Sequence, residues 1–173
     1  DGYWQNRVHK FTNNGDLISS WGEGEPVFNQ EAWELYRKED NPNATGNTGT
    51  GPGEFNLPHD VTVDSNNNVY IMDRENNRCQ IFDIDGNFIN EWKDVRGPND
   101  AVIDDNEVMH IAEGIGSVLI TTLKGEVIGR WGSKGEDPGN FRGSPHGIWI
   151  DKQGDMYISE VGTTKGLQKF ARV

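Results

Sequence analysis

The chain has 173 residues, only 33% of them hydrophobic, with 22 glycines and with six Trp, seven Phe and four Tyr, a profile typical of short strands and tight turns rather than of a helical bundle. Its net charge of −12 repels phosphate backbones, so nucleic acid is not an expected partner. A membrane is not expected either, because no stretch has the roughly 18–20 apolar residues of a spanning helix, and the single cysteine, Cys79, excludes an intrachain disulfide.

Residues 1–25 look like the second half of a repeating unit. Two alternating segments, Arg7–Phe11 and Leu17–Trp21, flank an Asn-Gly turn, which predicts an antiparallel hairpin. Residues 26–50 form an insertion, in which Asn29–Asp40 could be a short helix and the remainder is a polar loop. Such an insertion either borders a functional site or is a tolerated surface loop.

The rest of the chain repeats a unit of about 43 residues, in segments 51–95, 96–137 and 138–173. Equivalent residues of the first and third segments are two such periods apart: His59 and His146, Asp64 and Asp151, Tyr70 and Tyr157. Each complete unit has four short alternating segments separated by Asp-Gly or Asn-rich turns, which is the pattern of four meandering strands. A β-sandwich would not explain the equal spacing.

The sequence therefore predicts an all-β fold, a β-propeller with about three and a half four-stranded blades. The ring is not expected to close within this chain, so the first and last blades would expose unpaired edges. Two arrangements satisfy this expectation: the chain is part of a longer protein, or a second copy completes the ring as a homo-oligomer.

Particular motifs resemble those of known families. The segment Gly51–Phe55, the following Pro58-His59, the run Asp73–Arg78 and the closing Trp92 resemble NHL repeats. More narrowly, these motifs resemble the peptidyl-α-hydroxyglycine α-amidating lyase family and its bacterial NHL relatives, as do Tyr3 with its neighbours and Pro145-His146. The resemblance covers nearly the whole chain apart from residues 22–50.

This resemblance implies a six-bladed ring with a zinc ion held by three histidines in the central channel. His59 and His146 match two of those ligands, Tyr3 matches the residue that takes the substrate's hydroxyl proton, and Arg74 matches an arginine that holds substrate. The implied reaction cleaves a C-terminal α-hydroxyglycine into a peptide amide and glyoxylate. Gly147 stands where the family has an Asp linked to a structural calcium, which puts calcium in doubt.

The residues themselves support part of this site. His59 and His146 begin innermost strands two blades apart, and Asn99 occupies the same place between them. Three imidazoles from alternate blades of a six-bladed ring would form a tripod for zinc, with an open position for water or substrate. The third ligand is expected two blades before His59, ahead of Asp1. His9 and His110 are expected on later strands of their blades.

Other interpretations of these residues stay open. The histidines could pack at the channel mouth as part of the repeat, and Arg74 could pair with a carboxylate, as Arg7 and Arg78 are expected to do. Tyr3 has a reference pKa near 10, so it could act as a base only if a cation lowers that pKa.

Three functions follow from these observations: a metal-dependent lyase, a non-catalytic propeller that binds a protein or peptide, or a calcium-dependent hydrolase of the lactonase type. The last would need a cluster of channel ligands, for which Asp60, Asn99 and Asp100 are the candidates. The composition is that of a soluble protein; secretion or a periplasmic location of the full-length form is compatible with it.

Overall fold

The structure, a computed structural model, describes residues 6–22, 49–163 and 166–172. Within these ranges the regular elements are strands, apart from one turn of 3-10 helix, η1 (Arg74–Asn76). The helix expected at Asn29–Asp40 lies outside the described residues. No helix in the described ranges is long and apolar enough to cross a membrane.

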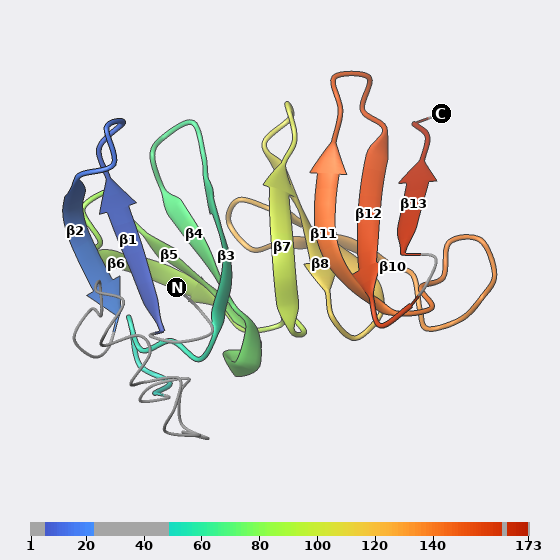
Figure 1. Ribbon diagram of the computed structural model, residues 1–173, viewed down its shortest axis with the longest axis horizontal. Coiled ribbons are helices and arrows are strands. Elements are labelled where there is room, and N and C mark those ends of the chain that lie inside the picture. Colours follow the sequence, from blue (N-terminus) through green and yellow to red (C-terminus); the bar gives the residue numbers. More distant parts are fainter. Residues whose placement is uncertain (1–5, 23–48, 164–165, 173) are drawn as a thin grey trace.

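The strands form four antiparallel sheets arranged one after another in chain order (Figure 1). The first sheet has two strands, β1 (Arg7–Phe11) and β2 (Leu17–Gly22). The second has four: β3 (Pro58–Val63), β4 (Val69–Asp73), β5 (Arg78–Phe82) and β6 (Phe88–Trp92). The third also has four: β7 (Pro98–Ile103), β8 (Val108–Glu113), β9 (Ser117–Thr122) and β10 (Val127–Trp131). The fourth has three described strands: β11 (Ser144–Ile150), β12 (Met156–Val161) and β13 (Leu167–Phe170).

Within the second and third sheets, strands that are consecutive in the chain pair with one another, which is the meander of a propeller blade. The strands nearest one another in neighbouring sheets are the first of each: β3 contacts β7, and β7 contacts β11 (Figure 1). These three inner strands are the elements on which the sequence places His59, Asn99 and His146. The all-β, blade-forming architecture predicted from the repeat is confirmed.

Aspartates set the turns between strands. In the β3–β4 turn, Asp64 Oδ1 accepts hydrogen bonds of 2.8 Å from the backbone N–H groups of Asn66 and Asn68. Asp104 and Asp151 make the same pair of bonds in the equivalent turns of the next two sheets. Such Asx turns satisfy backbone donors that the strands leave unpaired, which explains why the repeat places an Asp at the end of each inner strand.

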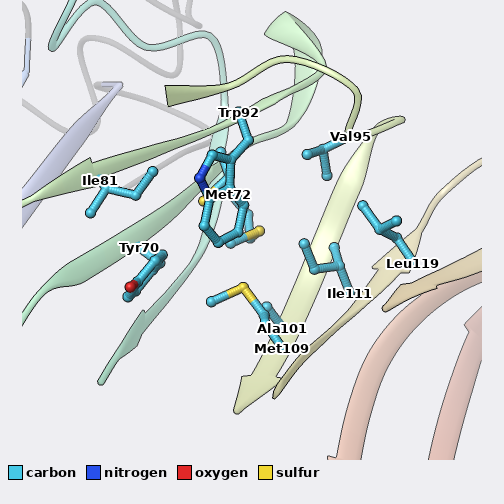
Figure 2. Close-up of a cluster of buried hydrophobic side chains, with 10 residues drawn as sticks. Tyr70, Met72, Ile81, Trp92, Val95, Ala101, Met109, Ile111 and Leu119 are labelled. Atoms are coloured by element: carbon cyan, nitrogen blue, oxygen red, sulfur yellow. The ribbon is translucent and has the colours of Figure 1, made fainter. Parts of the chain in front are cut away.

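Neighbouring sheets are joined by buried apolar clusters. The cluster between the second and third sheets includes Met72 and Trp92 on one side and Met109 and Ile111 on the other (Figure 2). The closing Trp of one sheet lies against a turn glycine of the next: a Cβ on Gly125 would lie 2.5 Å from Trp92 Cδ1. The repeated Trp and Gly therefore form the contact between blades.

Candidate functional site

The inner strands share an irregular start. The register shifts between Pro58 and Asp60, between Pro98 and Asp100, and between Pro145 and Gly147. Because proline has no N–H to give to the ladder, a bulge is tolerated directly after it, and bulges redirect side chains. The residue inside each bulge is the one singled out from the sequence: His59, Asn99 or His146.

The structure brings His59 and His146 together, although they are 87 positions apart in the chain. Their ring centroids are 4.7 Å apart with an interplanar angle of 82°, an edge-to-face contact between the start of β3 and the start of β11. Both side chains are partly exposed. Two imidazoles that meet at an accessible end of the inner strands could bind one ligand or one metal ion jointly.

Asn99 lies between the two histidine strands and is 3% exposed. Its carbonyl oxygen is 2.6 Å from His59 Nδ1, which makes Nδ1 the protonated nitrogen of that ring and Nε2 the one with the lone pair. Its side-chain Nδ2 donates to the carbonyl oxygen of Pro145, at 2.6 Å, and to Ser144 Oγ, at 3.3 Å. Asn99 therefore connects the strands of both histidines instead of acting as a third ligand.

The charge state of His59 follows from this environment. Burial lowers the pKa of His59, the bond to the Asn99 carbonyl and the charge of Asp100 act in the opposite direction, and electrostatic interaction with His146 and Arg74 lowers it further. A lowered pKa keeps the imidazole neutral at pH 7, and the neutral form is the one that can bind a metal or accept a proton.

A second layer of side chains follows the histidines along the same strands. Asp60 Oδ2 accepts a hydrogen bond from the N–H of Ala101, at 3.0 Å, and Asp100 Oδ2 accepts one from the N–H of Ile148, at 2.7 Å. Each carboxylate thus fastens its own blade to the inner strand of the next. The series ends at Gly147, which occupies the equivalent place on β11 and has no carboxylate.

Asp60 and Asp100 also interact directly. Burial, followed by repulsion from Asp100, raises the pKa of Asp60 to about 7, and the two carboxyl groups hydrogen bond to each other. Two carboxylates this close cannot both ionise at low cost, so the pair holds one proton up to about neutral pH. The carboxyl layer is therefore less negative than its residues suggest.

Arg74 lies in η1, at the end of β4, and its guanidinium Nη2 is 2.8 Å from Glu75 Oε1. Its charge reaches His59, whose pKa it lowers. Arg78 has the structural role expected of it: its Nε is 2.7 Å from Asp73 Oδ2, and both side chains are almost fully buried. Tyr3 lies outside the described residues.

Of the other two described histidines, His110 is on β8, a later strand of its blade, as expected, and His9 is on β1 of the two-stranded sheet. His9 on β1 is 2.8 Å from Ser20 Oγ, and His110 on β8 is 3.3 Å from Asp104 Oδ2. His110 is on the second strand of its sheet, whereas His9 lines a pocket together with His59. Their partners belong to the same sheet, so both rings stabilise a blade.

The residues near the histidine pair supply part of a zinc site. The described part of the chain contains no group of three or more His, Cys, Asp or Glu side chains that could hold a metal ion. It does supply two imidazoles in contact, with the tautomer of one fixed by Asn99. This donor set fits two ligands of a zinc ion, since imidazole nitrogen is a preferred zinc ligand.

One feature of the site was not foreseen from the sequence. Leu57, two residues before His59, has φ +60°, a left-handed conformation that costs a bulky residue about 1–3 kcal/mol. In the next blade Gly97 has the same place and a φ of +57°. The N–H of Leu57 donates to Asn6 Oδ1, at 2.8 Å, which links this strained turn to the first sheet. The glycine at the equivalent place in the next blade, Gly97, was the available signal.

Comparison with known proteins agrees with this architecture. A family model described as NHL repeat matches residues 55–82. NHL repeat-containing protein 3 from Homo sapiens is 30% identical over 72% of this chain, and the match spans 38% of that protein. Peptidyl-glycine alpha-amidating monooxygenase A from Xenopus laevis is 32% identical over 54% of this chain and 8% of that protein.

Among solved structures, virginiamycin B lyase from Staphylococcus aureus, in a catalytically inactive variant with quinupristin, superimposes with a TM-score of 0.59. The sequence identity is 17%, and the match covers 96% of this chain and 48% of the lyase. The chain thus spans about half the length of the structures it matches and little more than a third of NHL repeat-containing protein 3. It is an NHL-repeat domain of the propeller type, distantly similar to NHL repeat-containing protein 3 and to peptidyl-glycine alpha-amidating monooxygenase.

Proposed function

We propose that this domain belongs to a lyase that cleaves a peptidyl-α-hydroxyglycine into a peptide amide and glyoxylate. The observation that carries the proposal is the edge-to-face contact of His59 and His146 at the start of two inner strands. The similarity to peptidyl-glycine alpha-amidating monooxygenase over 54% of the chain supports the same chemistry. The likeness to virginiamycin B lyase supports the fold.

The reaction is an elimination without net oxidation. The hydroxyl group of the substrate loses its proton, the carbon–oxygen double bond of glyoxylate forms, and the bond from that carbon to the amide nitrogen breaks. The nitrogen then takes up a proton and leaves as the peptide amide. The site must therefore bind a carboxylate, accept one proton and return another.

Residues of this chain can meet these needs. Arg74, whose charge already reaches His59, supplies a cation for the substrate carboxylate. Tyr3, which lies outside the described residues, is our candidate for the proton acceptor. His59 and His146 would hold a zinc ion, which when bound supplies a Lewis acid for the substrate hydroxyl.

The test combines metal analysis with turnover, using the full-length protein. N-benzoyl-α-hydroxyglycine is the substrate, and released glyoxylate is measured. We expect stoichiometric zinc and glyoxylate release that His59→Ala and His146→Ala each reduce by at least about tenfold, since loss of a residue that merely orients a metal ligand already costs about 10–100-fold. His110→Ala is the matched control, because His110 lies on β8. Equal turnover by His59→Ala and the unaltered protein would refute the proposal.

A second candidate is a propeller that binds a protein or peptide without catalysis. Pairs of exposed apolar residues on the outer strands favour it: Leu17 with Ile18, Phe88 with Ile89, and Val127 with Ile128. A peptide array decides between the two. Binding that His59→Ala leaves unchanged, in a protein with no zinc and no glyoxylate release, would favour this second function.

A further inference from the structure

The relative position of His59 and His146 depends on β7, the inner strand between theirs, which contacts both β3 and β11 (Figure 1). Asn99, in the bulge of β7, bonds to His59 through its carbonyl oxygen and to Pro145 through its side-chain amide. Pro145 directly precedes His146 in the chain. We infer that the Asn99 side chain is a positioning residue, which holds the two histidines at the separation at which they share one metal ion. The inference rests on the proposed function and adds a residue to its site.

The bond from Asn99 to Pro145 resembles the bond from His59 to Asn99 one blade earlier. In each case the side chain of the bulge residue reaches a backbone carbonyl oxygen at the start of the next inner strand, at 2.6 Å. His59 makes its bond through Nδ1 and keeps the lone pair of Nε2 for a ligand. The amide nitrogen of Asn99 has no lone pair to offer to a metal ion. Asn99 therefore keeps the link between blades and leaves metal binding to the histidines.

The backbone on both sides of His146 is attached to β7. Before it, the carbonyl oxygen of Pro145 accepts the bond from Asn99; after it, the N–H of Ile148 donates to Asp100 Oδ2, at 2.7 Å. A bulge disrupts the bonds of the strand ladder, so contacts of this kind set the direction of the side chain inside it. Removing the Asn99 amide would delete one of the two attachments and would take a donor from a backbone carbonyl oxygen.

The amide of Asn99 has little room to move. The side chain is 3% exposed, and Nδ2 also donates to Ser144 Oγ, at 3.3 Å. That hydroxyl group is fixed in turn, because it donates to the carbonyl oxygen of Gly114, at 3.0 Å. A Cβ on Gly114 would lie 3.1 Å from Asn99 Nδ2 and 3.2 Å from Ser144 Oγ. Gly114→Ala would therefore crowd the amide without changing Asn99 itself.

NMR of the full chain, first without metal and then during a zinc titration, tests the inference. Asn99→Leu keeps the branched shape of the side chain and removes the donor. Without metal, we expect this variant to lose the nuclear Overhauser effect between the rings of His59 and His146, whose centroids are 4.7 Å apart. With zinc, the signals of the two rings should shift at different zinc concentrations. Zinc affinity should fall about 10–100-fold, the cost of losing a residue that orients a metal ligand.

Two controls separate positioning from a general loss of stability. Thr121→Val also removes a buried hydrogen bond, but one made on β9 to the backbone of Thr122, so the ring contact and the zinc affinity should stay unchanged. Gly114→Ala serves if Asn99→Leu does not fold, and it should separate the two zinc responses in the same way. Its control is Gly129→Ala, because a Cβ on Gly129 meets nothing within 4 Å.

The outcomes distinguish this inference from the proposed function. A ring contact and a joint zinc response that survive in Asn99→Leu, or in Gly114→Ala where Asn99→Leu does not fold, would overturn the inference. Glyoxylate release that Asn99→Leu leaves unchanged would keep the lyase and refute the positioning role. Rings that separate in metal-free Asn99→Leu, in a protein whose unaltered form releases no glyoxylate, would refute the lyase and keep the positioning role.

Discussion

The contacts between blades use the same residues in successive blades, whereas the starts of the inner strands differ from blade to blade. Between blades, the same devices recur: Trp21 lies against Gly86, and Trp92 lies against Gly125. At the starts of the inner strands, by contrast, each blade differs, with His59, Asn99 and His146 in one layer and Asp60, Asp100 and Gly147 in the next. Packing imposes the same demand on every blade, so a difference between blades at equivalent positions indicates a role specific to the site.

Buried ion pairs also stabilise the blades, and Arg78→Met would break the most buried of those described. The change leaves the Asp73 carboxylate, which is fully buried, without its 2.7 Å partner. We expect a loss of about 3–5 kcal/mol in the free energy of unfolding, measured by denaturant titration. Arg96→Met is the control, since Arg96 pairs with Asp94 and these two side chains are 51% and 66% exposed. An equal loss in both variants would show that burial is not the cause.

The carboxyl layer should make stability depend on pH. The pKa of Asp60 is about 7 in the folded protein and near 4 when unfolded. Between about pH 4 and about pH 7 the folded state therefore holds a proton on this carboxyl group that the unfolded state has lost. The stabilisation that this raised pKa contributes to the free energy of unfolding is fully present below about pH 4. It is lost as pH rises through about 7, by up to about 4 kcal/mol. Asp60→Asn should remove this decline in thermal unfolding experiments from pH 4 to pH 8.

Asp83, a carboxylate whose pKa is lowered instead of raised in the folded protein, serves as the control. Hydrogen bonds from the side chain and then the backbone of Asn87 lower the pKa of Asp83, so Asp83→Asn should destabilise the protein at neutral pH and lose that effect in acid. An unchanged pH dependence in Asp60→Asn would contradict the proposed sharing of a proton by Asp60 and Asp100.

The Trp–Gly contact between blades is expected to have a smaller effect. Gly125 combines φ +84° with the close approach of Trp92, so Gly125→Ala adds strain and a clash, at a cost of about 1–3 kcal/mol. Gly15 has a similar φ, +89°, with nothing within 4 Å of an added Cβ. Gly15→Ala therefore measures the backbone strain alone. Equal losses of stability in the two variants would show that the contact with Trp92 contributes nothing.

The sequence was sufficient for the fold and for part of the site. The period of about 43 residues placed His59 and His146 at equivalent positions, and the structure indeed brings their rings into contact. The direction of the Asn99 side chain could not be predicted, because it depends on a bulge and on the neighbouring blade. The raised pKa of Asp60 depends on its burial and on its distance from Asp100, which no spacing in one sequence reveals. The left-handed Leu57 likewise requires backbone coordinates.

The central claim is that His59 and His146 act as one site. The most direct measurement is a zinc titration of the full chain at neutral pH, followed through the NMR signals of the histidine rings. We expect the signals of His59 and His146 to shift together at the same zinc concentration, while that of His110 stays in place. We also expect His146→Ala to abolish the shift of His59. A His59 signal that responds to zinc equally well without His146, or not at all, would contradict the account.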